Sequence, residues 1–122
     1  MHYSVMLKEV IESLNLKDSG TYVDATLGYA GHTSEILKRV KRGFIFAFDQ
    51  DINAINYSQE KLNKIGSNFL IIKSNFLYMK EELAKQGVYQ VDGIVFDLGV
   101  SSPQLDTKER GFSYHADSRR DM

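Results

Sequence analysis

The chain has 122 residues, of which 43% are hydrophobic and 25% are charged, and its formal net charge is −1. This length favours one domain with one core. The single proline is not typical of a low-complexity chain, and the absence of cysteine excludes a disulfide framework and a thiolate metal site. With its near-neutral charge, the chain lacks the overall basic character typical of a stand-alone RNA-binding protein, so any contact with RNA would be local or made by sequence outside this chain.

The sequence also gives a default expectation for location. No apolar run reaches the roughly 20 residues that span a bilayer. The first residues lack the basic segment and apolar stretch of a signal peptide. We therefore expect a cytoplasmic protein without a membrane partner.

Helical and extended patterns alternate along the chain. Apolar residues three and four positions apart predict helices, and short apolar runs predict strands buried on both faces of a sheet. In chain order, the patterns predict a helix at 4–14, a strand at 21–26, a helix at 32–41, a strand at 44–48, a helix at 52–65, a strand at 69–72, a helix at 77–86 and a strand at 91–96. Ser4 and Asp51 are candidate N-caps. No periodicity is visible after Val100.

The alternation of strands and helices indicates βαβ units on a parallel sheet. With right-handed crossovers, we expect a Rossmann-like, doubly wound α/β fold. Its mostly parallel sheet would have about four strands in the order 3-2-1-4, with the first strand in the centre. The fourth strand, residues 91–96, would then form an exposed apolar edge.

Polar and glycine-rich segments follow three of the four predicted strands. The first strand leads into a loop with Gly28 and Gly31, which would let a ligand approach the backbone at the start of a helix. Asp49 follows the second strand, 21 residues after Gly28, at the spacing of an acid that binds ribose hydroxyls. Asp97 opens the segment that follows the fourth strand. In an open α/β sheet these segments meet at the edge where nucleotides bind.

Each of these features also has an ordinary structural interpretation. The two glycines would suit a tight turn, and Asp51 would suit a helix cap. His32 could bond only to the backbone at a helix start, and Asp97 could simply end a strand. The coincidence of all of them at one edge favours a nucleoside site.

The loop discriminates between two cofactors. The dinucleotide fingerprint is G-x-G-x-x-G, and counted from Gly28 this chain has Ala30 and Thr33 at the second and third glycine positions. Asp24 precedes Gly28 by four residues and would repel a diphosphate, whereas it would attract the ammonium and sulfonium of S-adenosylmethionine. The loop therefore favours S-adenosylmethionine over NAD.

Several longer motifs carry a family resemblance. The most specific is DGIVFDLGVSSPQLD at 92–106, followed by ERGFSY at 109–114. YVDATLG at 22–28 and DQD at 49–51 add to it. Over essentially all of residues 1–122, the chain resembles the N-terminal part of the bacterial ribosomal RNA small-subunit methyltransferase H family, also called MraW.

The resemblance implies a class I methyltransferase sheet. It also implies an S-adenosylmethionine-dependent enzyme that methylates the exocyclic N4 of a cytidine in small-subunit (16S) ribosomal RNA, its RNA partner. No metal and no catalytic residue are assigned. The implied cofactor-binding residues are Ala30, Gly31, His32, Asp49, Phe76, Asp97 and Gln104. The loop amides would hold the methionine carboxylate, Asp49 the ribose and Phe76 the adenine, while Asp97 and Gln104 would hold the cationic methionine end.

The sequence departs from the family pattern in its loop and in its length. The usual G-x-G-G-H is GYAGH here, so Ala30 replaces the middle glycine, and cofactor affinity should fall if that position needs a positive φ. Smaller departures are Ser4 and Arg119-Arg120. Family members are much longer, so we expect residues 1–122 to be the cofactor-binding part, without the family's helical insert and C-terminal strands.

Three functions are compatible with the sequence. The first is a base methyltransferase that is complete only with further sequence. The second is a non-catalytic module that binds the cofactor without methyl transfer. The third is another nucleoside-dependent enzyme, such as an NAD-dependent oxidoreductase.

Overall fold

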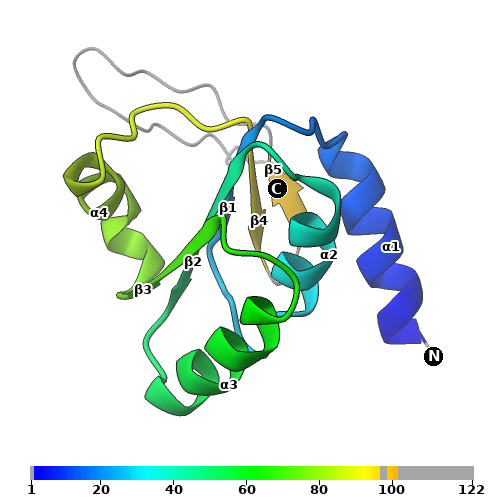
Figure 1. The fold of residues 1–122 in the computed structure, drawn as a ribbon, viewed down its shortest axis with the longest axis horizontal. Helices are drawn as coiled ribbons and strands as arrows, with labels where there is room; N and C mark the ends of the chain where they lie inside the picture. Colours follow the sequence, from blue (N-terminus) through cyan, green and yellow to red (C-terminus); the bar gives the residue numbers. More distant parts are fainter. Residues whose placement is uncertain (1, 97–98, 102–122) are drawn as a thin grey trace.

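A computed structural model describes residues 2–96 and 99–101 of the chain. A central sheet lies between α1, α2 and α3 on one side and α4 on the other (Figure 1). In chain order, the elements are α1 (His2–Leu14), β1 (Thr21–Asp24), α2 (Gly31–Arg39), β2 (Phe44–Asp49), α3 (Ile52–Asn63), β3 (Phe69–Lys73), the 3-10 turn η1 (Phe76–Tyr78), α4 (Met79–Lys85), β4 (Gly93–Phe96) and β5 (Gly99–Ser101).

The sheet has the order β3-β2-β1-β4-β5. The first four of these strands are parallel, which confirms the predicted fold class and the 3-2-1-4 order. The prediction that residues 91–96 form an exposed edge is wrong, because β5 pairs antiparallel with β4, with Phe96 opposite Gly99. A strand of three residues is too short to show an alternating pattern in the sequence.

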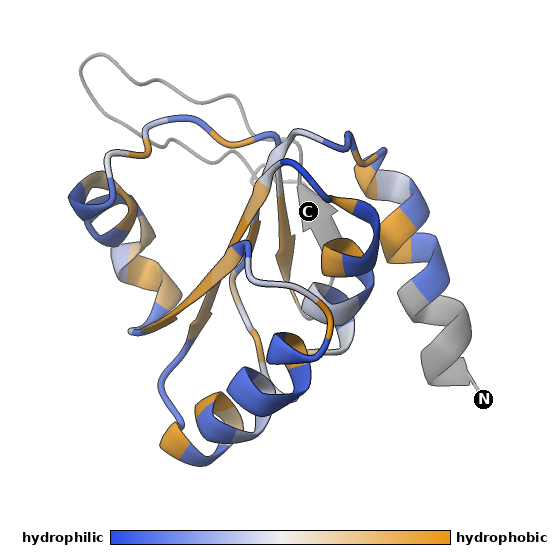
Figure 2. Ribbon diagram, viewed as in Figure 1, coloured by the Kyte–Doolittle hydropathy of each residue, from blue (hydrophilic) through white to orange (hydrophobic). Residues whose placement is uncertain are grey.

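Alternation along the strands divides the core into two layers. Tyr22 and Ile45 face α1, α2 and α3, whereas Val23 and Phe46 face α4. Successive strand residues point to opposite faces, so a sheet covered on both sides needs continuous apolar strands. Figure 2 shows this as orange along the central strands and mixed colours on the outer helices.

The element boundaries differ from the predicted ones at several points. Helix α1 begins at His2, so Ser4 lies inside the helix and is not its N-cap. Asp51 does cap α3, because its side chain accepts a hydrogen bond from the Asn53 amide (2.9 Å). Strand β1 ends at Asp24, which leaves residues 25–30 free to form the loop before α2.

The loops at the amino edge of the sheet are tied together. The Asp18 carboxylate accepts hydrogen bonds from the Lys41 amide (2.9 Å) and the Arg42 side chain. The hydrogen bond from the Lys41 amide is the largest cause of the lowered pKa of Asp18, and the hydrogen bond from the Arg42 side chain is the second. Beside them, Gly43 packs so closely on Gly20 that a Cβ at Gly43 would lie 1.8 Å from the Gly20 carbonyl oxygen.

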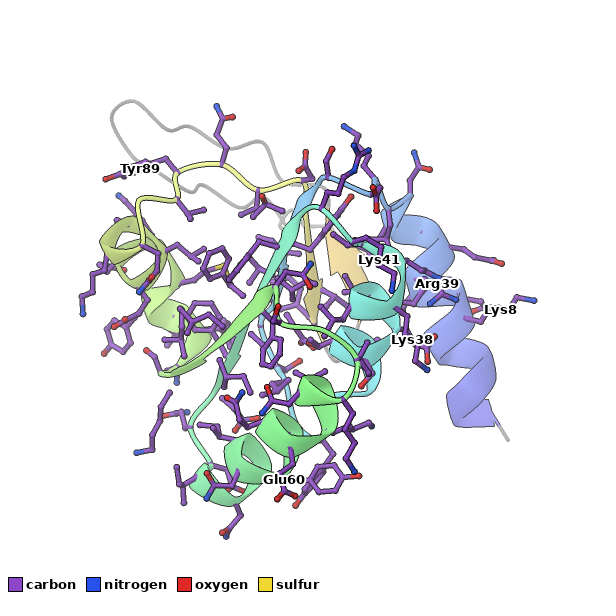
Figure 3. The ribbon with its side chains drawn as sticks, in the orientation of Figure 1. Lys8, Lys38, Arg39, Lys41, Glu60 and Tyr89 are labelled. Atoms are coloured by element: carbon purple, nitrogen blue, oxygen red, sulfur yellow. The ribbon has the colours of Figure 1, made fainter. Side chains whose placement is uncertain are left out.

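Basic side chains gather on the surface formed by α1, α2 and the residues just after α2. Lys8, Lys38, Arg39 and Lys41 lie on this side of the molecule, away from α4 (Figure 3). Glu35 pairs with both Lys38 (3.1 Å) and Arg39 (2.8 Å).

No helix in the described part of the chain is long and apolar enough to cross a membrane.

Candidate cofactor-binding site

A cavity of about 350 Å³ opens at the carboxyl ends of β1, β2 and β3. Its volume is within the range of small-molecule sites. The residues that line it are Ala25, Thr26, Gly28, Phe48, Asp49, Gln50, Asp51, Ser74, Asn75 and Phe76. The cavity therefore lies at the edge of the sheet where the sequence places a nucleoside site.

Asp49 links β2 to the glycine loop. Its Oδ2 accepts a hydrogen bond from the Gly28 amide (2.8 Å), and its Oδ1 accepts one from the Asp51 amide (2.8 Å). Each carboxylate oxygen has two lone pairs, so both oxygens retain acceptor capacity. The Asp49 carboxylate can thus hold the loop and still accept hydrogen bonds from two vicinal hydroxyl groups.

The loop before α2 contains two residues with positive φ, Gly28 (+54°) and Ala30 (+69°). Ala30 is the N-cap residue of α2 and is fully buried, and its amide donates to the Leu27 carbonyl oxygen (2.8 Å). The position where the family pattern has glycine therefore does adopt the left-handed conformation. An alanine there costs about 1 kcal/mol in backbone strain.

Gly31 and His32 form the first turn of α2 and are partly exposed. They directly follow the loop that lines the cavity with Ala25, Thr26 and Gly28, but neither they nor Ala30 is among the lining residues. Free amides at a helix start favour an anionic group, such as a carboxylate. These residues could hold the outer end of a ligand whose nucleoside lies in the cavity.

Asp24 is completely buried at the end of β1 and does not line the cavity, whereas Ala25 and Thr26 beside it do. Its carboxylate accepts hydrogen bonds from the Thr26 amide (3.1 Å) and the Thr33 hydroxyl (2.6 Å). The bond to Thr33 joins the end of β1 to the first turn of α2. Asp24 thus fixes the two ends of the glycine loop relative to each other.

Phe76 lies in η1, after β3, and lines the cavity. Its ring packs edge-on against Phe96, with centroids 5.9 Å apart and an interplanar angle of 82°. This contact orients a partly buried aromatic ring that lines the same cavity as Asp49 and Asp51. A flat aromatic ligand can pack on such a ring.

The structure brings together Asp49 and Phe76, two of the predicted cofactor residues, in one cavity. Asp97 and Gln104 lie outside the described residues. Sequence reasoning missed Ser74 and Asn75, which follow β3 at the same edge. The signal was present, because Ser74-Asn75 is a polar pair directly after a predicted strand.

Comparisons with known proteins agree with this architecture. Residues 1–122 match the sequence model of the MraW methylase family. The chain is 57% identical to a ribosomal RNA small subunit methyltransferase H from Mesoplasma florum and 54% identical to one from Mycoplasmopsis agalactiae. Each alignment covers 99% of this chain, which spans 39% and 40% of these two relatives.

Two solved structures are similar at lower identity. An rRNA methylase from Streptococcus thermophilus is 25% identical with a TM-score of 0.55, over 74% of this chain and 48% of that one. A SAM-dependent methyltransferase from Aquifex aeolicus is 30% identical with a TM-score of 0.50, over 57% of this chain and 38% of that one. With a family match that spans all 122 residues, the chain belongs to the MraW methylase family.

Proposed function

We propose that this chain is the S-adenosylmethionine-binding part of a methyltransferase that modifies the N4 amino group of a cytidine in small-subunit ribosomal RNA. The observation that carries the proposal is the cavity between Asp49 and Phe76, bordered by the glycine loop, in a chain of the MraW methylase family. The chain spans about two fifths of the curated relatives, so the complete reaction is proposed for a protein that also contains their remaining segments.

The chemistry of the cavity suits a nucleoside without a diphosphate. Its lining in the described part of the chain includes the carboxylates of Asp49 and Asp51 and no basic side chain. Two carboxylates would repel a diphosphate, whereas ribose hydroxyls would donate to them. This favours S-adenosylmethionine over NAD, and the Aquifex aeolicus relative is described as SAM-dependent.

Each wall of the site would hold one part of the cofactor. Asp49 would accept hydrogen bonds from the ribose hydroxyls, and Phe76 would pack on the adenine. The amides of Gly31 and His32 at the start of α2 would bind the methionine carboxylate. When bound, the cofactor supplies an electrophilic methyl group on its sulfonium.

The remaining predicted roles fall on residues outside the described part of the chain. The cytosine amino group is a poor nucleophile because its lone pair is delocalised into the ring. Hydrogen-bond acceptors in the segment from Asp97 to Gln104 would localise that lone pair and align the amine. The base must be single-stranded or unstacked to reach them.

The proposal is tested by methyl transfer from radiolabelled S-adenosylmethionine to small-subunit ribosomal RNA, free and in the small subunit. Two proteins are compared: the 122-residue chain, and a chimera in which the remaining segment of the Mesoplasma florum relative follows it. We expect the chain to bind the cofactor and the chimera to label cytidine N4. Label on another atom, or no label from a folded chimera that binds the cofactor, would refute the proposed reaction.

A further inference from the structure

Helix α3 holds the glycine loop through a buried serine. The Ser58 side chain is fully buried, and its hydroxyl donates a hydrogen bond to the Gly28 carbonyl oxygen (2.9 Å). On the other side of the same residue, the Gly28 amide donates to Asp49 (2.8 Å). Both backbone polar groups of Gly28 are therefore fixed by side chains from outside the loop.

A second contact from α3 fixes the next residue of the loop. The Lys61 ammonium donates to the Tyr29 carbonyl oxygen (3.1 Å) and lies 5.9 Å from the centroid of the Tyr57 ring. The Tyr29 and Tyr57 rings pack edge to face at 5.1 Å. Residues 57 and 61 are one helical turn apart, so both reach the loop from the same side of α3.

These contacts act on a loop that is strained. Ala30 has a φ of +69°, which an alanine adopts only at a cost. Without restraints at Gly28 and Tyr29, the loop would shift toward conformations in which Ala30 is relaxed. Such conformations would change the orientation of the amides at the start of α2, because Gly31 directly follows Ala30.

We propose that Ser58, assisted by Lys61, is a positioning residue that keeps the glycine loop in its cofactor-binding conformation and offsets the strain at Ala30. Neither side chain is among the residues that line the cavity in the described part of the chain, so both would act through the loop. The inference rests on the proposed function, because cofactor affinity is one of its two readouts.

The first test compares two buried serines in the 122-residue chain. Ser58→Ala removes the bond to Gly28, whereas the control Ser34→Ala removes a buried hydroxyl that has no hydrogen-bond partner among the described residues. Titration with S-adenosylmethionine should show affinity about 3- to 10-fold weaker for Ser58→Ala, the range for one lost hydrogen bond. Ser34→Ala should bind like the unmodified chain.

Lys61→Met, with Lys64→Met as its control, provides the same test should Ser58→Ala fail to fold. Lys61 contacts the loop, whereas Lys64 is exposed at the end of the same helix. We expect weaker cofactor binding for the Lys61 variant alone. Equal affinities for the two lysine variants would overturn the role of Lys61.

A double-mutant cycle tests the link to strain. Ala30→Gly relieves the strain, so it should raise the affinity of Ser58→Ala by a clearly larger factor than it raises the affinity of the unmodified chain. The same factor in both backgrounds would contradict the proposed compensation.

Hydrogen exchange at the amides of residues 28–31, measured without cofactor, is the second readout. It should be faster in Ser58→Ala than in Ser34→Ala. Equal exchange in the two variants would overturn the inference even if the cofactor binds. Absence of cofactor binding by the unmodified folded chain would instead refute the proposed function, while exchange would still decide whether Ser58 holds the loop.

Discussion

The hydrogen bond between Thr33 and Asp24 should contribute a large share of the stability around the loop. Both side chains are completely buried, and the Thr33 hydroxyl lies 2.6 Å from the Asp24 carboxylate. Thr33→Val has nearly the same shape but no hydroxyl, so the change removes the donor without opening a cavity. The buried carboxylate would lose one of the hydrogen bonds that compensate it for lost hydration.

The expected magnitude follows from the burial of the acceptor. Leaving a buried polar group without its hydrogen-bond partner costs about 1–3 kcal/mol. Each kcal/mol corresponds to roughly 4 °C in the melting temperature for a chain of this size. We therefore expect Thr33→Val to lower the free energy of unfolding by about 2 kcal/mol and Tm by about 8 °C.

Urea unfolding followed by circular dichroism at neutral pH measures this loss. Thr33→Ser is the matched control, because it keeps the hydroxyl and loses only a buried methyl group, at a cost of about 1 kcal/mol. A valine variant that unfolds within about 0.5 kcal/mol of the unmodified chain, or that is more stable than the serine variant, would show that the bond to Asp24 is not what stabilises this region.

Three further changes have defined outcomes. Gly43→Ala places a Cβ 1.8 Å from the Gly20 carbonyl oxygen, so the free energy of unfolding, measured by thermal unfolding, should fall by more than about 3 kcal/mol. A decrease below about 1 kcal/mol would mean that the two loops can move apart at little cost. Ser34→Ala removes a buried hydroxyl that has no hydrogen-bond partner in the described part of the chain. The free energy of unfolding, measured by urea titration, should therefore rise by about 0.5–1 kcal/mol. A decrease would show that the hydroxyl does make a stabilising hydrogen bond. The lowered pKa of Asp18 means that its stabilising effect is complete above its ordinary pKa and is lost as the pH falls through the folded-state value. The stability difference between the unmodified chain and Asp18→Asn should therefore be constant above about pH 5 and shrink below about pH 4; a difference independent of pH would refute the role of the charge.

The sequence was sufficient for the parallel part of the fold. Residues 44–48 form a continuous apolar run, the pattern of a strand that is covered on both faces. The helices between the strands then indicate right-handed crossovers and a parallel sheet. Strand β5 could not be predicted in this way. It has three residues, and its position depends on pairing with β4 rather than on a pattern of its own.

The candidate site was predictable where a residue type at a given place in the fold has a common ligand. An acid at position 49, after a buried strand and a glycine loop, points to ribose, and the structure places Asp49 in the cavity. The role of Asp24 was not visible, because it rests on a hydrogen bond from Thr33, which belongs to another element. The contact between Ser58 and Gly28 was equally hidden, since the two residues are 30 positions apart and no local pattern connects them.

Calorimetric titration of the 122-residue chain with S-adenosylmethionine measures whether the cavity binds the cofactor, with NAD as the alternative ligand and Asp49→Ala as the variant. Asp92→Ala is the matched control, because the Asp92 carboxylate also accepts a backbone hydrogen bond, from the Thr21 amide (2.8 Å), but at the amino edge of the sheet. We expect saturable binding of S-adenosylmethionine by the unmodified chain and by Asp92→Ala, with binding lost in Asp49→Ala and no binding of NAD. A folded chain that does not bind S-adenosylmethionine, or that binds NAD equally well, would refute the assignment of the cavity to this cofactor.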